Sequence, residues 1–178
     1  MAVPFRLKSA PIPKEKSSAP GSSSAFPRYP LVDSEILVHA SCVAIDGFAI
    51  LLRGPSGSGK SDLALRLIDD DAALVADDQV ILEAVVLETG NGTLMASAPA
   101  VLSGLLEIRH IGIVKCDAIA AAPVRLVVDL AAAAIERMPS RETCLLLGID
   151  LPRITVNPFE ASAPAKVRIA LRNCLLQG

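Results

Sequence analysis

The stretch that decides the fold reads Gly54-Pro55-Ser56-Gly57-Ser58-Gly59-Lys60-Ser61. It matches the pattern G-x-x-x-x-G-K-[ST], in which backbone N–H groups enclose the phosphates of a nucleotide. Its glycines lack a Cβ, so the backbone can approach the phosphates closely. Lys60 is expected to reach the β- and γ-phosphates, and Ser61 to offer its hydroxyl to Mg²⁺. The stretch therefore predicts a phosphate-binding loop (P-loop) that takes ATP and Mg²⁺.

The sequence on either side fits such a loop. Phe48 to Leu52 is an apolar run that predicts a buried strand, and apolar residues recur at positions 63, 65, 67 and 68 of a following helix. A helix that begins at the loop directs the positive end of its dipole at the anion. The alternative, a Gly/Ser-rich turn that matches by chance, does not account for the strand before it and the helix after it.

Composition restricts the class of protein. Of the 178 residues 52% are hydrophobic but only 3% aromatic, so the interior must be built from Ala, Val, Leu and Ile. This favours a single α/β domain with a parallel or mixed sheet flanked by helices. A net charge of -2 supplies no basic field for nucleic acid, and runs such as Leu126 to Ile135 are too short to span a membrane. We expect neither nucleic acid nor membrane as a partner.

The four cysteines are scattered without metal-ligand spacing, which predicts free thiols in a reducing cytoplasm. Residues 1–30 are rich in proline and serine and show no apolar periodicity, which predicts a disordered tail before a domain at 31–178.

Hairpins and a closing helix account for most of the remaining chain. Asp46-Gly47 joins the β-rich run Ile36–Ile45, which contains His39, to the strand before the loop. His39 is thus expected near the loop, with a half-buried structural histidine as the alternative. Further expected elements are a hairpin of 80–87 and 93–96, strands at 123–130, 143–147 and 151–156, and a helix over 163–177 that could pack between subunits.

Two pairs of charged residues are candidates for chemistry. Asp77 and Asp78 follow the short strand 73–76, at the edge where open α/β sheets bind ligands. One such acid usually faces Mg²⁺ and the other can accept a proton from an attacking hydroxyl, although turn or capping acids remain the alternative. Glu107 and Arg109 lie in the apolar stretch 105–114, where burial would require a partner, a metal or a phosphate. An exposed loop is the alternative for them.

These segments, in this order, resemble the catalytic domain of the HPr kinase/phosphorylase family. His39, the glycine-rich loop, Val75-Ala76-Asp77-Asp78 and Leu106-Glu107-Ile108-Arg109 carry the resemblance, which covers about residues 39–156. It implies a bacterial serine kinase that uses ATP to phosphorylate HPr, the phosphocarrier protein of the phosphotransferase system. It also implies a fold related to phosphoenolpyruvate carboxykinase and a homo-oligomer, usually a hexamer.

The same resemblance assigns roles to individual residues. Asp78 is the proton acceptor and Asp77 assists it, while residues 106–115 match the family's signature region. The implied catalytic residues are His39, Lys60, Asp77, Asp78 and Arg137, and the implied magnesium ligands are Ser61 and Glu107.

The sequence also departs from the family pattern. His110 stands where the family has glycine, and residues 157–162 replace a stretch tied to dephosphorylation, which argues against phosphorylase activity. Only a tail precedes residue 31, as in the short alphaproteobacterial forms. Two other functions stay open: a P-loop kinase of a small metabolite, which would need an Arg-rich lid, and a regulatory protein that senses ATP without transferring phosphate.

Overall fold

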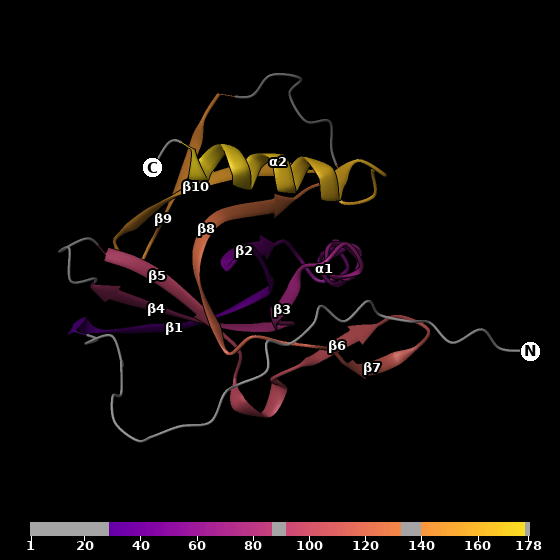
Figure 1. The fold of residues 1–178 in the computed structure, drawn as a ribbon, viewed down its shortest axis with the longest axis horizontal. Helices are drawn as coiled ribbons and strands as arrows, with labels where there is room; N and C mark the ends of the chain where they lie inside the picture. Colours follow the sequence, from indigo (N-terminus) through magenta and orange to yellow (C-terminus); the bar gives the residue numbers. More distant parts are fainter. Residues whose placement is uncertain (1–28, 87–91, 133–139, 177–178) are drawn as a thin grey trace, which may run out of the picture.

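The computed structural model describes residues 29–86, 92–132 and 140–176 (Figure 1). The predicted disordered tail lies outside these residues, except for Tyr29 and Pro30, with which the first strand begins. Arg137 and the turn of the second predicted hairpin also lie outside them.

One mixed layer of strands carries the glycine-rich loop. Its strand order is β3 (Ala73–Ala76), β1 (Tyr29–Ile45), β2 (Phe48–Arg53), β8 (Ala121–Leu130), β10 (Ile149–Val156) and β9 (Glu142–Leu146). β1 and β9 run against the other four strands. Strands β3, β2, β8 and β10 therefore all end at the same edge, which is where α/β sheets bind their ligands.

A second layer packs on one face of the first (Figure 1). It contains β4 (Gln79–Val86) and β5 (Gly92–Ser97), together with the first halves of β1 and β8. β1 pairs with β4 up to His39 and with β2 from Ala40 onward, so this one strand belongs to both layers. Leu51, Val127 and other apolar side chains fill the space between the layers.

Both described helices cover the other face of the first layer. These are α1 (Lys60–Asp69) and α2 (Ala163–Leu175), which bury Leu67 and Val167 against Ile50 and Leu126. The prediction of a sheet flanked by helices is thus correct for one face, whereas the second layer of strands covers the other. Within the described residues, no helix is long and apolar enough to cross a membrane.

A small separate hairpin stands beside α1 and β3 (Figure 1). It consists of β6 (Leu105–Ile108) and β7 (Gly112–Lys115), and a short 3₁₀ turn, η1 (Ala100–Leu102), precedes it. The expectation that Glu107 and Arg109 would be buried in this stretch is wrong, because both are exposed. Only the neighbouring strand residue Leu106 reaches the core, since alternate side chains of a strand point to opposite faces.

The remaining expected elements are confirmed to within a few residues. Asp46 and Gly47 adopt φ of 52° and 81°, as the tight turn of a hairpin requires. The first strand starts earlier than expected, at residue 29 rather than 36. All four cysteines are free, as predicted, and burial raises the pKa of the Cys42 thiol far above its ordinary value.

Candidate functional site

The glycine-rich loop, residues 54–61, joins β2 to the first turn of α1. It turns back on itself through a hydrogen bond from the Ser58 N–H to the Pro55 carbonyl, 3.1 Å long. A Cβ on Gly54 would lie 2.5 Å from Ser58 Oγ, so this close turn needs glycine there. Gly59 caps α1 with φ of 92°, a conformation that favours glycine. The eight residues predicted to bind ATP therefore form a tight loop, residues 54–59, followed by the first two residues of α1, Lys60 and Ser61.

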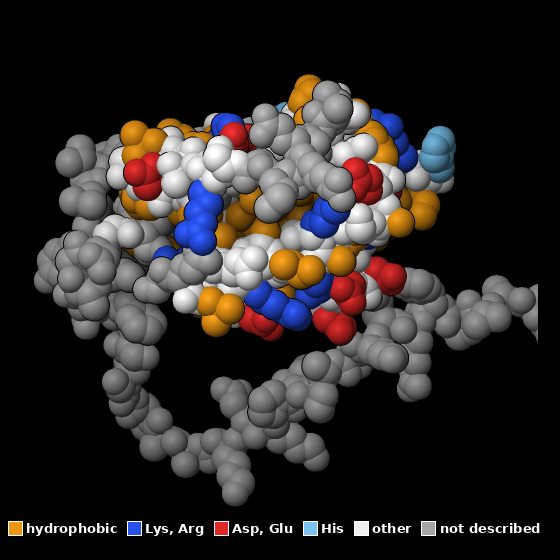
Figure 2. Space-filling view, turned by 90° about the horizontal axis from the view of Figure 1, so that it is seen from above, with side chains coloured by type: hydrophobic (Ala, Val, Ile, Leu, Met, Phe, Trp, Pro, Cys, Tyr) orange, Lys and Arg blue, Asp and Glu red, His pale blue; other side chains and the backbone are white. Residues whose placement is uncertain are grey.

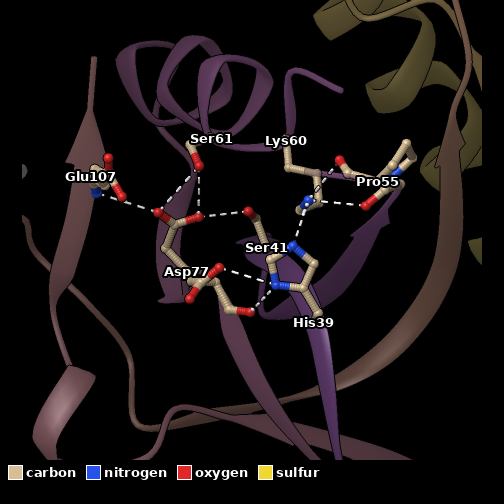
Figure 3. A network of polar contacts seen from close by, with 9 residues as sticks. His39, Ser41, Pro55, Lys60, Ser61, Asp77 and Glu107 are labelled. Carbon is tan, nitrogen blue, oxygen red and sulfur yellow. Dashed lines mark hydrogen bonds and ion pairs between the residues drawn. The ribbon is translucent and has the colours of Figure 1, made fainter. Parts of the chain in front are cut away.

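Lys60 is the first residue of α1 and is 7% exposed. Its ammonium donates hydrogen bonds to the carbonyls of Gly54 (2.9 Å) and Pro55 (3.1 Å), and lies 3.1 Å from His39 Nε2 (Figure 3). Burial lowers the pKa of Lys60, while the nearby carboxylates of Asp78 and Asp77 act in the opposite direction. The lysine is thus held at the loop by three contacts.

His39 links Lys60 to Asp78. Its Nδ1 lies 3.0 Å from both the carboxylate Oδ1 and the backbone carbonyl of Asp78. A lysine ammonium can only donate, so Nε2 must accept from Lys60 and the ring proton must sit on Nδ1, directed at Asp78. The structure therefore brings three of the predicted catalytic residues into one line, Asp78–His39–Lys60 (Figure 3).

Asp77 and Asp78 face opposite environments because of the turn between β3 and β4. The Gln79 N–H donates to the Asp77 carbonyl at 2.8 Å, which places Asp78, at φ of 67°, in the centre of a γ-turn. This turn leaves the Asp77 side chain inside, at 5% exposure, and the Asp78 side chain 66% exposed. Asp78 is thus the accessible carboxylate of the two.

The Asp77 carboxylate is fully hydrogen-bonded. It accepts from the Ser41 hydroxyl at 2.5 Å, from the Ser61 hydroxyl at 3.1 and 3.2 Å, and from the Glu107 backbone N–H at 3.3 Å (Figure 3). A loop serine beside an acid at the end of another strand of the same sheet is the pair that holds Mg²⁺ in P-loop enzymes. Ser61 and Asp77 therefore fit a magnesium ion, which is the role expected for one acid of the pair, whereas the family resemblance implied that Asp77 assists Asp78.

Glu107 and Arg109 reach the site from the β6–β7 hairpin. Glu107 contacts Asp77 through its backbone N–H, and its carboxylate is exposed. Among the residues that the structure describes, no three His, Cys, Asp or Glu side chains are grouped as a metal site. Arg109 Nη2 would lie 3.5 Å from a Cβ on Gly57, so its guanidinium is beside the tip of the loop.

Sequence reasoning did not identify Ser41, which is fully buried and bonded to Asp77. One signal was available: Ser41 follows His39 by two residues on the same strand, so both side chains point to the same face. A hydroxyl in a run that is otherwise apolar needs a buried partner. Asp77 is that partner.

The chain is similar to known proteins both in sequence and in fold. The family profile described as "HPr Serine kinase C-terminal domain" matches residues 32–167. The HPr kinase/phosphorylase of Geobacillus thermodenitrificans is 35% identical over 131 residues, which are 67% of this chain and 41% of the relative. That of Levilactobacillus brevis is 46% identical over 77 residues, 43% of this chain and 24% of the relative. The chain thus spans well under half the length of these curated relatives.

A solved structure shares the fold. It is the Hpr(Ser) kinase/phosphatase from Coxiella burnetii, which matches with a TM-score of 0.67 and 28% identity, over 80% of this chain and 92% of that one. The similarity covers most of the mixed α/β fold described above.

Proposed function

Because the chain belongs to the family of the HPr serine kinase C-terminal domain, we propose that it is an ATP-dependent serine kinase that phosphorylates the phosphocarrier protein HPr. One observation carries the proposal: an accessible carboxylate, Asp78, is connected through His39 to the lysine of the glycine-rich loop. Phosphoryl transfer needs this combination, a proton acceptor for the incoming hydroxyl beside a cation for the phosphates.

In the proposed reaction the triphosphate lies on residues 54–61, where backbone N–H groups and Lys60 bind its β- and γ-phosphates. Mg²⁺ would be held by Ser61 and Asp77, with Glu107 as the further ligand that the family resemblance implies, and would neutralise charge on the phosphates. Asp78 accepts the proton of the serine hydroxyl while the serine oxygen forms a bond to the γ-phosphorus. The bond from the γ-phosphorus to the bridging oxygen breaks, and ADP leaves. His39 orients the Asp78 carboxylate through its Nδ1–H.

Other features of the proposal rest on the sequence or on the family resemblance. They are a domain over residues 31–178, a P-loop fold related to phosphoenolpyruvate carboxykinase, a cytoplasmic location and a hexameric assembly. Arg137 would be a further catalytic arginine. We propose no nucleic-acid or membrane partner, in keeping with the net charge of -2. On the face above α2 and β10, acidic and basic side chains are interspersed with apolar ones (Figure 2).

Incubation with labelled ATP and purified HPr tests the function. We expect label on an HPr serine with the unaltered chain and none with Lys60→Ala, which removes the phosphate-binding cation. Asp78→Asn should retain ATP binding but lose at least about a hundred-fold in transfer rate, since general-base catalysis contributes 10²–10⁴-fold. Asparagine tolerates positive φ, so this variant should keep the γ-turn.

The same experiment separates the alternatives. Label on a small metabolite would indicate a metabolite kinase, and ATP binding without any labelled product would indicate a sensor of ATP. Either result would contradict the proposal. An unchanged rate of HPr labelling by Asp78→Asn would show that the proton acceptor is another group.

A further inference from the structure

The segment after β10 brings an aromatic ring to the glycine-rich loop. β10 and β2 run in the same direction, so residues 157–160 leave the sheet at the same edge as the loop. A Cβ on Gly59 would lie 3.2 Å from the Pro158 side chain and 3.5 Å from Phe159 Cε1. Pro158 and Phe159 therefore lie against the loop directly before Lys60.

Phe159 is exposed although it is held in place. Its side chain is 64% exposed, whereas that of Phe48 in β2 is partly buried. Its backbone N–H donates to Asn157 Oδ1 at 3.1 Å. Arg66 of α1 donates to the carbonyls of Pro158 and Glu160 on either side of it. Phe159 thus stands on a segment that is tied to the helix that follows the loop.

The site has two ends. Asp77 and Asp78 lie at one end, and Phe159 lies at the other. Asp77 follows β3, which lies on the β1 side of β2, whereas Phe159 follows β10, which lies on the β8 side. Arg109 is beside Gly57, and Phe159 is beside Gly59. A nucleotide whose γ-phosphate faces Asp77 and Asp78 would therefore extend its base toward Phe159.

From this arrangement we infer that Phe159 is the stacking surface for the base of the nucleotide, an inference that rests on the proposed function. An exposed ring fixed beside a phosphate site fits the flat face of a purine. Base–aromatic stacking is worth about 1–3 kcal/mol per base and tolerates different bases, because every base has a π-face. We therefore expect the site to accept both adenine and guanine nucleotides.

A tryptophan at this position tests the contact directly. The chain has no tryptophan and one tyrosine, so Phe159→Trp introduces a single tryptophan whose emission can be excited selectively. MgATP and MgGTP should change its emission, and inorganic tripolyphosphate with Mg²⁺ should not, because it has no base. Leu176→Trp, at an 84% exposed position, is the matched control and should respond to none of them. An equal response of Phe159→Trp to tripolyphosphate, or none to ATP, would overturn the inference.

Affinity provides the second measurement. Phe159→Ala should raise the Kd of MgATP roughly five-fold or more, as loss of stacking predicts, and leave the Kd of tripolyphosphate unchanged. If the Kd values of both ligands rise equally, Phe159 only supports the shape of the loop. If neither Kd rises, Phe159 does not contribute to binding. Either result contradicts the inference. Labelling of HPr is measured in a separate experiment. If nucleotide binding shows the base contact but HPr is not labelled, the inference about Phe159 stands and the proposed phosphate acceptor is wrong.

Discussion

Asp77 and Asp78 are adjacent residues of the same type with different surroundings. The turn at Asp78 buries one carboxylate among three hydrogen-bond donors and exposes the other beside His39. In such a pair the buried acid suits a metal that needs a fixed ligand, and the exposed acid suits a reaction that needs access to a substrate. The backbone conformation of one residue therefore separates the two roles that we propose for these acids.

Ser41→Ala should weaken the binding of Mg²⁺ at Asp77. It removes the shortest hydrogen bond to Asp77, and a lost bond to a buried charged group costs about 1–3 kcal/mol. We expect the Mg²⁺ concentration that gives half-maximal transfer to rise roughly five-fold or more, which corresponds to the lower end of that range. Nucleotide binding in EDTA should be unaffected. If binding without metal weakens by the same factor, Ser41 supports the fold of the site and not the metal.

At the scale of elements, one arginine connects a helix to the segment that follows a distant strand. Arg66 pairs with Asp62 within α1 at 2.8 Å and also contacts the carbonyls of Pro158 and Glu160. The glycine-rich loop and residues 157–160 are therefore positioned by the same helix.

Arg66→Ala should loosen this connection. With about 1 kcal/mol of hydrogen bonding lost, amide exchange in a peptide spanning residues 157–162 should become roughly five-fold faster. Arg172→Ala removes an exposed arginine of α2 for which no partner is found in the described part of the chain, and should leave exchange unchanged. Equal exchange in both variants would show that Arg66 does not anchor the segment.

At the scale of the whole molecule, the first layer is buried on both faces. β2 and β8 contribute alternate side chains to the core between the layers and to the core under the helices. Runs that are apolar on both faces, such as Phe48–Leu52 in β2, are what a sheet covered on both sides requires.

Leu126→Ala should therefore destabilise the fold. Leu126 is fully buried between β8 and the helices, and truncating such a side chain lowers the free energy of unfolding by about 2–5 kcal/mol. The same substitution at Leu176, which is 84% exposed, should change it by less than about 0.5 kcal/mol. Denaturant titration of the two variants measures the difference, and similar losses would contradict the assignment of the core.

Local signals made much of the molecule predictable. The loop, the hairpin turn at Asp46-Gly47 and the helix over 163–175 depend on residues that are close in sequence. The partners of Asp77 were not predictable in the same way. Ser41 and Glu107 are distant from Asp77 in sequence, and they meet it only because the folded chain places their strands side by side. The exposure of Glu107 was also missed, since an apolar stretch does not show whether its strand lies in a layer or stands outside it.

The passage of β1 from one layer to the other has a consequence for how the protein responds to warming. His39 is the last residue paired with β4, and the next residue is the first paired with β2. β1 thus joins the strand that follows Asp78, β4, to the strand that precedes the glycine-rich loop, β2. It cannot separate from one layer while the other layer stays folded. Heat inactivation and the loss of tertiary structure should therefore share one midpoint temperature.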